Sequence, residues 1–133
     1  MGLRYGNWEL EKELGSGHFS TLYRARREVL AGKNRYQFGA LKLLHPTEDI
    51  HMKLTVDNEL GKLAELNHPL LSRLLDHGQA QDGTKWFVMS YLEGTTLESY
   101  LKHHGRLSHD DWLKFCDQIL EELSYLKTKS ILH

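Results

Sequence analysis

The 133-residue sequence has little cysteine, little proline and almost no net charge. Its single cysteine, Cys116, cannot form an intramolecular disulfide, which favours a small core residue in a reducing compartment. A formal net charge of -1 without a long basic run argues against nucleic acid as the main partner. No apolar run approaches the roughly 18 residues of a membrane span, and no signal-peptide pattern is present. We therefore expect a cytoplasmic protein that has no membrane partner.

The nine histidines do not follow the spacing of a metal site. His103 and His104 are adjacent, and the others are scattered without paired i, i+4 spacing or cysteine partners. We expect surface histidines and no metal ligands.

Alternating and helical patterns divide the first 89 residues into strands with one inserted helix. Asp82-Gly83 lies between two apolar runs, which is a strong hairpin signal. The predicted strands cover 8–14, 21–26, 36–44, a run led by 70–75, and 85–89, and the predicted helix covers about 48–66.

Two further helices are expected after a short linker. Thr95 and Glu98 have the spacing of a capping box, Gly105 is a helix stop, and Ser108 begins the last helix. Leaving the wide apolar face of that helix in water costs about 1.5–3 kcal/mol per large side chain. We therefore expect self-association or a protein partner on this face, which we predict to be formed by Trp112, Phe115, Ile119, Leu120, Leu123 and Leu126, with Cys116 among them as a core residue.

A glycine-rich turn, Gly15-Ser16-Gly17, joins the first two predicted strands, and Lys42 follows on the third. Backbone N–H groups of such a turn can contact phosphates, and the lysine can supply the compensating charge. Glu59 on the inserted helix could hold Lys42 by an ion pair. A Rossmann unit is excluded, because it needs its glycine loop between a strand and a helix.

Four motifs in order resemble the small lobe of the protein kinases. They are Leu14-Gly15-x-Gly17-x-Phe19-Ser20-x-Leu22, Gly39-Ala40-Leu41-Lys42, Glu59 with the later His68-Pro69, and Val88–Gly94. The resemblance implies an α+β fold with a five-stranded antiparallel sheet and helix C. It also implies a nucleotide-binding small lobe over 1–89, a hinge over 90–94, and over 95–133 the start of a truncated large lobe with helices D and E. Ser20 replaces the family's third glycine.

The resemblance also implies ATP as the ligand. Lys42 would contact the α- and β-phosphates while paired with Glu59, and these two are the candidate catalytic residues. Met89 would be the gatekeeper at the back of the pocket. The implied ATP-binding residues are Leu14, Gly15, Ser16, Gly17, His18, Phe19, Ser20, Leu22, Ala40, Lys42, Met89, Ser90, Leu92 and Glu93.

The last residue, His133, resembles the histidine of the family's His-Arg-Asp motif. The catalytic base and the Mg²⁺ ligands of kinases follow that motif, so we expect the 133-residue chain alone to be inactive and Mg²⁺ to bind only with that segment. We expect the ATP-binding lobe of a serine/threonine kinase. The alternatives are a natural truncated homologue that serves as a non-catalytic binding module or half of a split kinase, a tyrosine kinase, and a small-molecule kinase of similar architecture.

Overall fold

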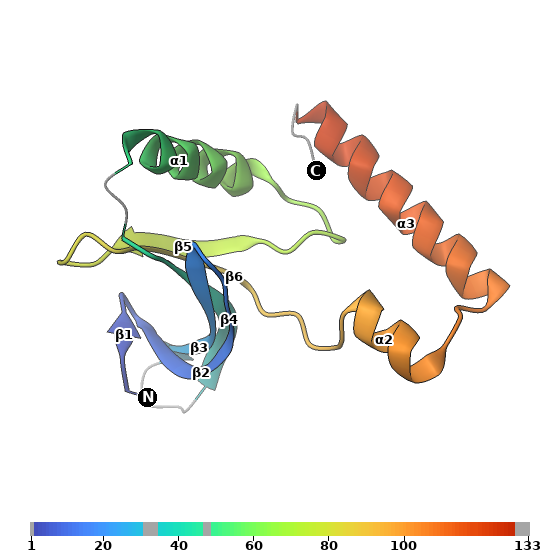
Figure 1. Cartoon of the computed structure of the whole chain (residues 1–133), viewed down its shortest axis with the longest axis horizontal. Helices are drawn as coiled ribbons and strands as arrows, with labels where there is room; N and C mark the ends of the chain where they lie inside the picture. Colours follow the sequence, from blue (N-terminus) through green and yellow to red (C-terminus); the bar gives the residue numbers. More distant parts are fainter. Residues whose placement is uncertain (1, 31–34, 47–48, 130–133) are drawn as a thin grey trace.

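The computed structural model describes residues 2–30, 35–46 and 49–129. Over these residues the chain forms one antiparallel sheet and three helices, an α+β fold, with the strands in the order β1-β2-β3-β4-β6-β5. Figure 1 shows a curled sheet with α1 over one side, and α2 and α3 on an arm that follows β6. The elements are β1 (Arg4–Tyr5), β2 (Trp8–Ser16), β3 (Ser20–Leu30), β4 (Arg35–Leu44), α1 (Ile50–Glu65), β5 (Leu74–Gln79), β6 (Lys85–Ser90), α2 (Leu97–His104) and α3 (His109–Thr128).

All five predicted strands are present, and the structure adds a sixth, β1. Tyr5 of β1 pairs with Trp8 of β2 across a turn in which Gly6 has a φ of 58°. A strand of two residues shows no alternation of polar and apolar positions, so its sequence gives no periodic signal.

The predicted helices are confirmed, with adjusted ends. The side chain of Asp49 caps α1 by accepting from the His51 and Met52 amides, and the predicted start at residue 48 lies outside the described residues. The capping box expected from Thr95 and Glu98 is not formed. Thr96 is the N-cap of α2 instead and accepts from the Ser99 amide, because the helix begins one residue later.

The core lies where the sheet folds over itself. Two glycines allow this close packing, since a Cβ on Gly39 would lie 2.3 Å from Val88 Cγ1, and one on Gly78 would lie 2.5 Å from Trp86 Cζ2. Gly39, the first residue of the Gly39-Ala40-Leu41-Lys42 motif, thus has no space for a side chain, because its neighbours fill that space. The buried side chains of this core are Trp8, Leu10, Ala25, Leu41, Trp86 and Val88.

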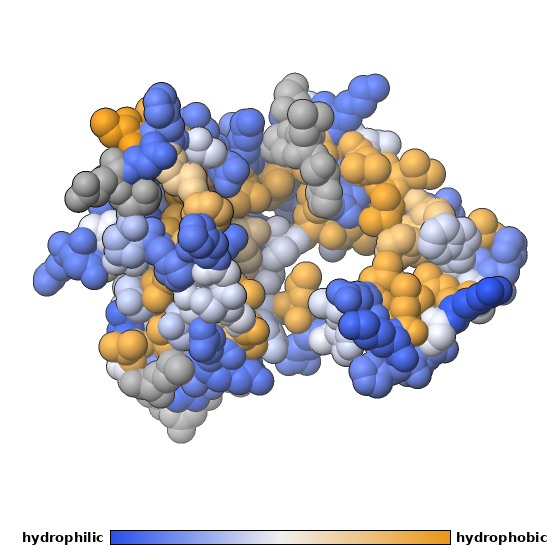
Figure 2. Space-filling model, in the orientation of Figure 1, coloured by the Kyte–Doolittle hydropathy of each residue, from blue (hydrophilic) through white to orange (hydrophobic). Residues whose placement is uncertain are grey.

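The apolar face of α3 is largely uncovered in this chain. Only Leu126 is buried, near the end of the helix, whereas Trp112 is 50% exposed and Leu120 62% exposed. Cys116 is a free thiol that is half-buried rather than in the core, because no element of the described residues packs over the middle of α3. Figure 2 shows hydrophobic surface gathered over α2 and α3. No helix within the described residues is long and apolar enough to cross a membrane.

Candidate functional site

Strand register brings four of the predicted nucleotide-binding residues to one face of the sheet. Leu22 of β3 lies opposite Lys42 of β4, and Ala40 of β4 lies opposite Met89 of β6. Residues directly opposite share a face, and residues two apart on a strand share it too. Leu41 points to the other face, where it is completely buried in the core. The candidate site is therefore the polar and partly open face, and the core fills the opposite one.

The glycine-rich turn forms the tip of the β2–β3 hairpin. The Gly17 amide donates to the Ser20 carbonyl at 2.8 Å, which closes the turn. A Cβ on Gly15 would meet no atom within 4 Å, so the backbone there is open to a ligand. At the tip, the exposed His18 and Phe19 rings pack edge to face with centroids 4.8 Å apart.

Lys42 is half-buried, and its Nζ lies 5.7 Å from the centroid of the Phe87 ring. The structure does not bring Lys42 and Glu59 together: no ion pair joins them, and Glu59 is exposed. Instead α1 is tied to the sheet through Asp57, whose Oδ1 lies 2.5 Å from Lys85 Nζ. Residues two apart on a helix are about 200° apart around its axis, so Asp57 and Glu59 point to nearly opposite sides.

The strand that leads into the expected hinge is braced by the chain segment before β5. The Ser90 amide donates to the Arg73 carbonyl at 2.8 Å, and the Ser72 hydroxyl donates to the Ser90 carbonyl at 3.1 Å. A carbonyl oxygen has two lone pairs, so that of Ser90 can still accept from a ligand. Leu92 and Glu93, which follow, are exposed.

Arg24 belongs to this face and was not predicted from the sequence. It lies opposite Ala40, its guanidinium stacks 4.2 Å over the Phe38 ring and 5.3 Å from the Tyr91 ring, and it pairs with Glu11 at 3.0 Å. It therefore links the expected hinge to the sheet. These partners lie far apart in sequence, and no local pattern joins them.

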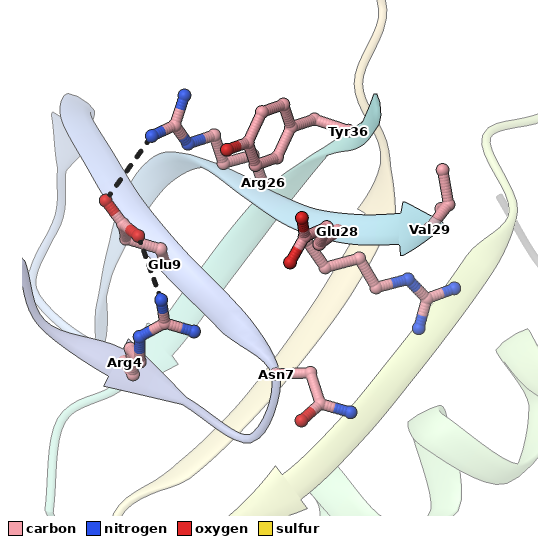
Figure 3. Close-up of a pocket in the computed structure, with 8 residues that line it drawn as sticks. Arg4, Asn7, Glu9, Arg26, Glu28, Val29 and Tyr36 are labelled. Carbon is pink, nitrogen blue, oxygen red and sulfur yellow. Dashed lines mark hydrogen bonds and ion pairs between the residues drawn. The ribbon is translucent and has the colours of Figure 1, made fainter. Parts of the chain in front are cut away.

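Beyond Arg24 the same face ends in a charged hollow of about 520 Å³ between β1, β2, β3 and β4. Figure 3 shows Glu9 between Arg4 and Arg26, and it pairs with them at 3.2 and 3.7 Å. The Arg26 guanidinium also stacks 4.3 Å from the Tyr36 ring. The arginines and glutamates that line the hollow compensate most of one another's charge. The hollow is therefore the polar end of this sheet face.

A second hollow of about 620 Å³ lies between the hairpin tip, α1 and the β5–β6 turn. Phe19, Pro46 and Val56 supply part of its apolar wall, and Asp57 and Lys85 part of its polar wall. Within the described residues there is no group of three or more histidine, cysteine, aspartate or glutamate side chains that could hold a metal ion.

Comparisons with known proteins show to which family the chain belongs. The sequence matches the protein tyrosine and serine/threonine kinase family over residues 8–133. It is 29% identical over 129 residues to the cAMP-dependent protein kinase catalytic subunit PRKX of Mus musculus, which covers 96% of this chain and 35% of that protein. It is also 29% identical to CBL-interacting serine/threonine-protein kinase 1 of Arabidopsis thaliana, over 99% of this chain and 29% of that protein.

A bacterial protein, the probable serine/threonine-protein kinase PknB of Lactococcus lactis, is 23% identical over 95% of this chain and 20% of its own length. The family match covers nearly the whole chain, and the chain therefore belongs to the protein kinase family. It spans about a third or less of the length of these curated relatives.

Proposed function

We propose that this chain is the ATP-binding lobe of a serine/threonine protein kinase, in which the whole protein transfers the ATP γ-phosphate to a protein hydroxyl. The observation that carries the proposal is the shared sheet face on which Leu22, Ala40, Lys42 and Met89 lie beside an open glycine turn. In this division residues 1–89 are the small lobe, 90–94 the hinge, and 95–133 the start of the large lobe. We also place the protein in the cytoplasm, on the basis of its composition.

The residues of this face fit a nucleotide. Apolar side chains can hold the flat adenine ring, while a single lysine and the backbone amides of a glycine turn suit phosphates. Leu14, Leu22 and Ala40 would sandwich the base, and the backbones of Ser90 and Leu92 would bind its polar edge. Lys42 would meet the α- and β-phosphates. The remaining contacts would come from the backbone amides of Ser16 to Ser20, from Met89 at the back, and from Glu93 near the ribose.

Pairing of Lys42 with Glu59 belongs to the nucleotide-bound state in this proposal. It requires α1 to turn, because Asp57 rather than Glu59 now faces a lysine. Such a turn is inexpensive here, since α1 has no buried residue and its ion pair to β6 is partly exposed.

The 133-residue chain by itself is proposed to bind ATP without using it. The described residues provide no metal-binding cluster, and the family's catalytic base and Mg²⁺ ligands follow the motif to which His133 is assigned. His133 lies outside the described residues.

A second candidate function is a non-catalytic kinase homologue that binds a protein partner or completes a split kinase. The exposed apolar face of α3 favours it, because a surface of this kind normally packs against protein. In a single kinase chain the large lobe would cover the same face, so the observation supports a contact without deciding its source.

Titration of the chain with fluorescent trinitrophenyl-ATP tests ATP binding. We expect saturable binding that ATP reverses and that Lys42→Ala weakens at least tenfold, by loss of a partly desolvated charge contact. Lys62→Ala, at an exposed lysine on α1, serves as the matched control. A phosphotransfer assay with labelled ATP tests the second half of the proposal: turnover by the wild-type chain that is lost in Lys42→Ala would refute its inactivity.

A further inference from the structure

We propose that His45 is a positioning residue that fixes the tip of the glycine-rich turn for phosphate binding. The proposal rests on the ATP site proposed above and adds a residue outside its motifs. His45 directly follows β4 and lies beside the hairpin tip, where its backbone amide donates to the Phe19 carbonyl at 2.8 Å.

Both ring nitrogens of His45 hold the hairpin. Nδ1 lies 3.0 Å from the His18 carbonyl, and Nε2 lies 2.9 Å from Thr21 Oγ1. Thr21 Oγ1 lies in turn 3.2 Å from Ser16 Oγ on the facing strand. One imidazole therefore connects β2, β3 and the tip between them.

The donors of this network follow from its acceptors. A carbonyl oxygen can only accept, so Nδ1 carries the hydrogen toward His18. In the tautomer with its hydrogen on Nδ1, Nε2 accepts from the Thr21 hydroxyl, whose oxygen is left to accept from Ser16. The result is a directed chain of three hydrogen bonds in which every bond has one donor and one acceptor.

Thr21 and Leu22 point to opposite faces of the hairpin because they are neighbours on one strand. Thr21 is paired with Leu43, which packs against the core, whereas the next residue, Leu22, is paired with Lys42 on the candidate site. His18 and His45 both line the hollow between the hairpin tip and α1, so the network holds the turn at the edge of that hollow.

The sequence favours this arrangement of His45. A residue before proline is pushed toward extended backbone, and Pro46 therefore keeps the chain running along β3 where the ring meets the tip. A turn held near its ligand-bound position raises the fraction of molecules competent to bind, which lowers the apparent Kd by the same factor.

The test measures trinitrophenyl-ATP binding and amide hydrogen exchange on the full 133-residue chain. We expect His45→Ala and Thr21→Val to raise the Kd about three- to tenfold and to speed exchange at residues 17–20. Thr21→Ser, which keeps the hydroxyl, should leave both the Kd and the exchange rate at the wild-type values. The double variant should bind like His45→Ala alone, because both changes break one network.

His77→Ala is the control, since His77 is an exposed strand histidine whose ring has no hydrogen bond or ion pair among the described residues. Thermal melting separates a local effect from general unfolding, and His45→Asn supplies a second, smaller change if the alanine variant is unstable. Wild-type affinity and exchange in both His45→Ala and Thr21→Val would refute the proposal. If the wild-type chain does not bind nucleotide, the ATP site itself is refuted, and the exchange data alone decide whether the network holds the tip.

Discussion

The backbone amide of Asn67 donates a 2.8 Å hydrogen bond to the hydroxyl of Tyr125, a residue 58 positions later. The neighbouring His68 reinforces the contact, with its ring 4.9 Å from that of Tyr125 and its Nε2 3.3 Å from Glu121 Oε1. These contacts bring the end of α3 back to the segment that follows α1, as Figure 1 shows. Two parts of the chain separated by the whole α2 arm are thereby joined.

Removal of that hydroxyl in Tyr125→Phe should lower the free energy of unfolding by about 0.5–1.5 kcal/mol, the net value of one such bond. Urea denaturation followed by circular dichroism measures it. Tyr100→Phe is the matched control, because the Tyr100 hydroxyl has no hydrogen bond among the described residues. Equal effects of the two variants would mean that the Asn67 bond does not stabilise the chain.

Gly39→Ala should destabilise the sheet by about 1–3 kcal/mol or more, because the added Cβ would lie 2.3 Å from Val88 Cγ1 and 3.0 Å from Trp8 Cζ3. Both neighbours are completely buried and cannot move aside easily. The midpoint of chemical denaturation reports the change.

The same substitution in α1 serves as its control and should have the opposite sign. A Cβ on Gly61 would meet nothing within 4 Å, so Gly61→Ala gains about 1 kcal/mol of helix propensity with no clash. Destabilisation by both changes would show that the space around each glycine does not decide the outcome.

Charge on the exposed face of α3 should abolish self-association. Leu120 is 62% exposed, and Leu120→Glu places a carboxylate in the proposed contact, where its burial is costly. Light scattering at micromolar concentration should show an oligomer for the wild type and a monomer for this variant. Leu54→Glu, at a leucine 56% exposed on α1, should leave the oligomer intact. A strictly monomeric wild type would rule out self-association.

Acid should weaken the β5–β6 turn through Asp82. Hydrogen bonds from the Thr84 amide and then its side chain hold the pKa of Asp82 below its ordinary value of 3.8. A lowered folded-state pKa gives stability that is present above 3.8 and is lost as the pH falls through the folded value. The difference in melting temperature between wild type and Asp82→Asn should therefore shrink below pH 3.8. A difference in melting temperature that stays constant down to the lowest pH at which the chain folds would argue against a stabilising role of the Asp82 carboxylate.

Local patterns were sufficient for the elements themselves. The alternation after Trp8, the helical spacing that includes Val56 and Leu60, and the serine before α3 each predict an element that the structure contains. They failed where the signal was short or shifted by one residue, as for β1 and for the cap of α2 at Thr96.

The sequence likewise predicted some residues of the candidate site and missed others. Motif spacing named Lys42, Ala40 and Leu22, and strand register then brought them to one face. It did not reveal Arg24 or His45, because their partners are contacts across strands and not positions in a motif. The pairing of Lys42 with Glu59 stays a prediction, since it depends on how α1 is rotated about its axis.

The sequence by itself determined the order of strands and helices, the glycine turn and the kinase family, because periodicity and motif spacing are properties of neighbouring residues. Only the tertiary structure decided which side chains meet: Asp57 rather than Glu59 facing the sheet, and His45 beside the glycine turn. Such contacts depend on helix rotation and sheet curvature, which arise from the packing of the whole lobe around Trp8, Leu41 and Val88.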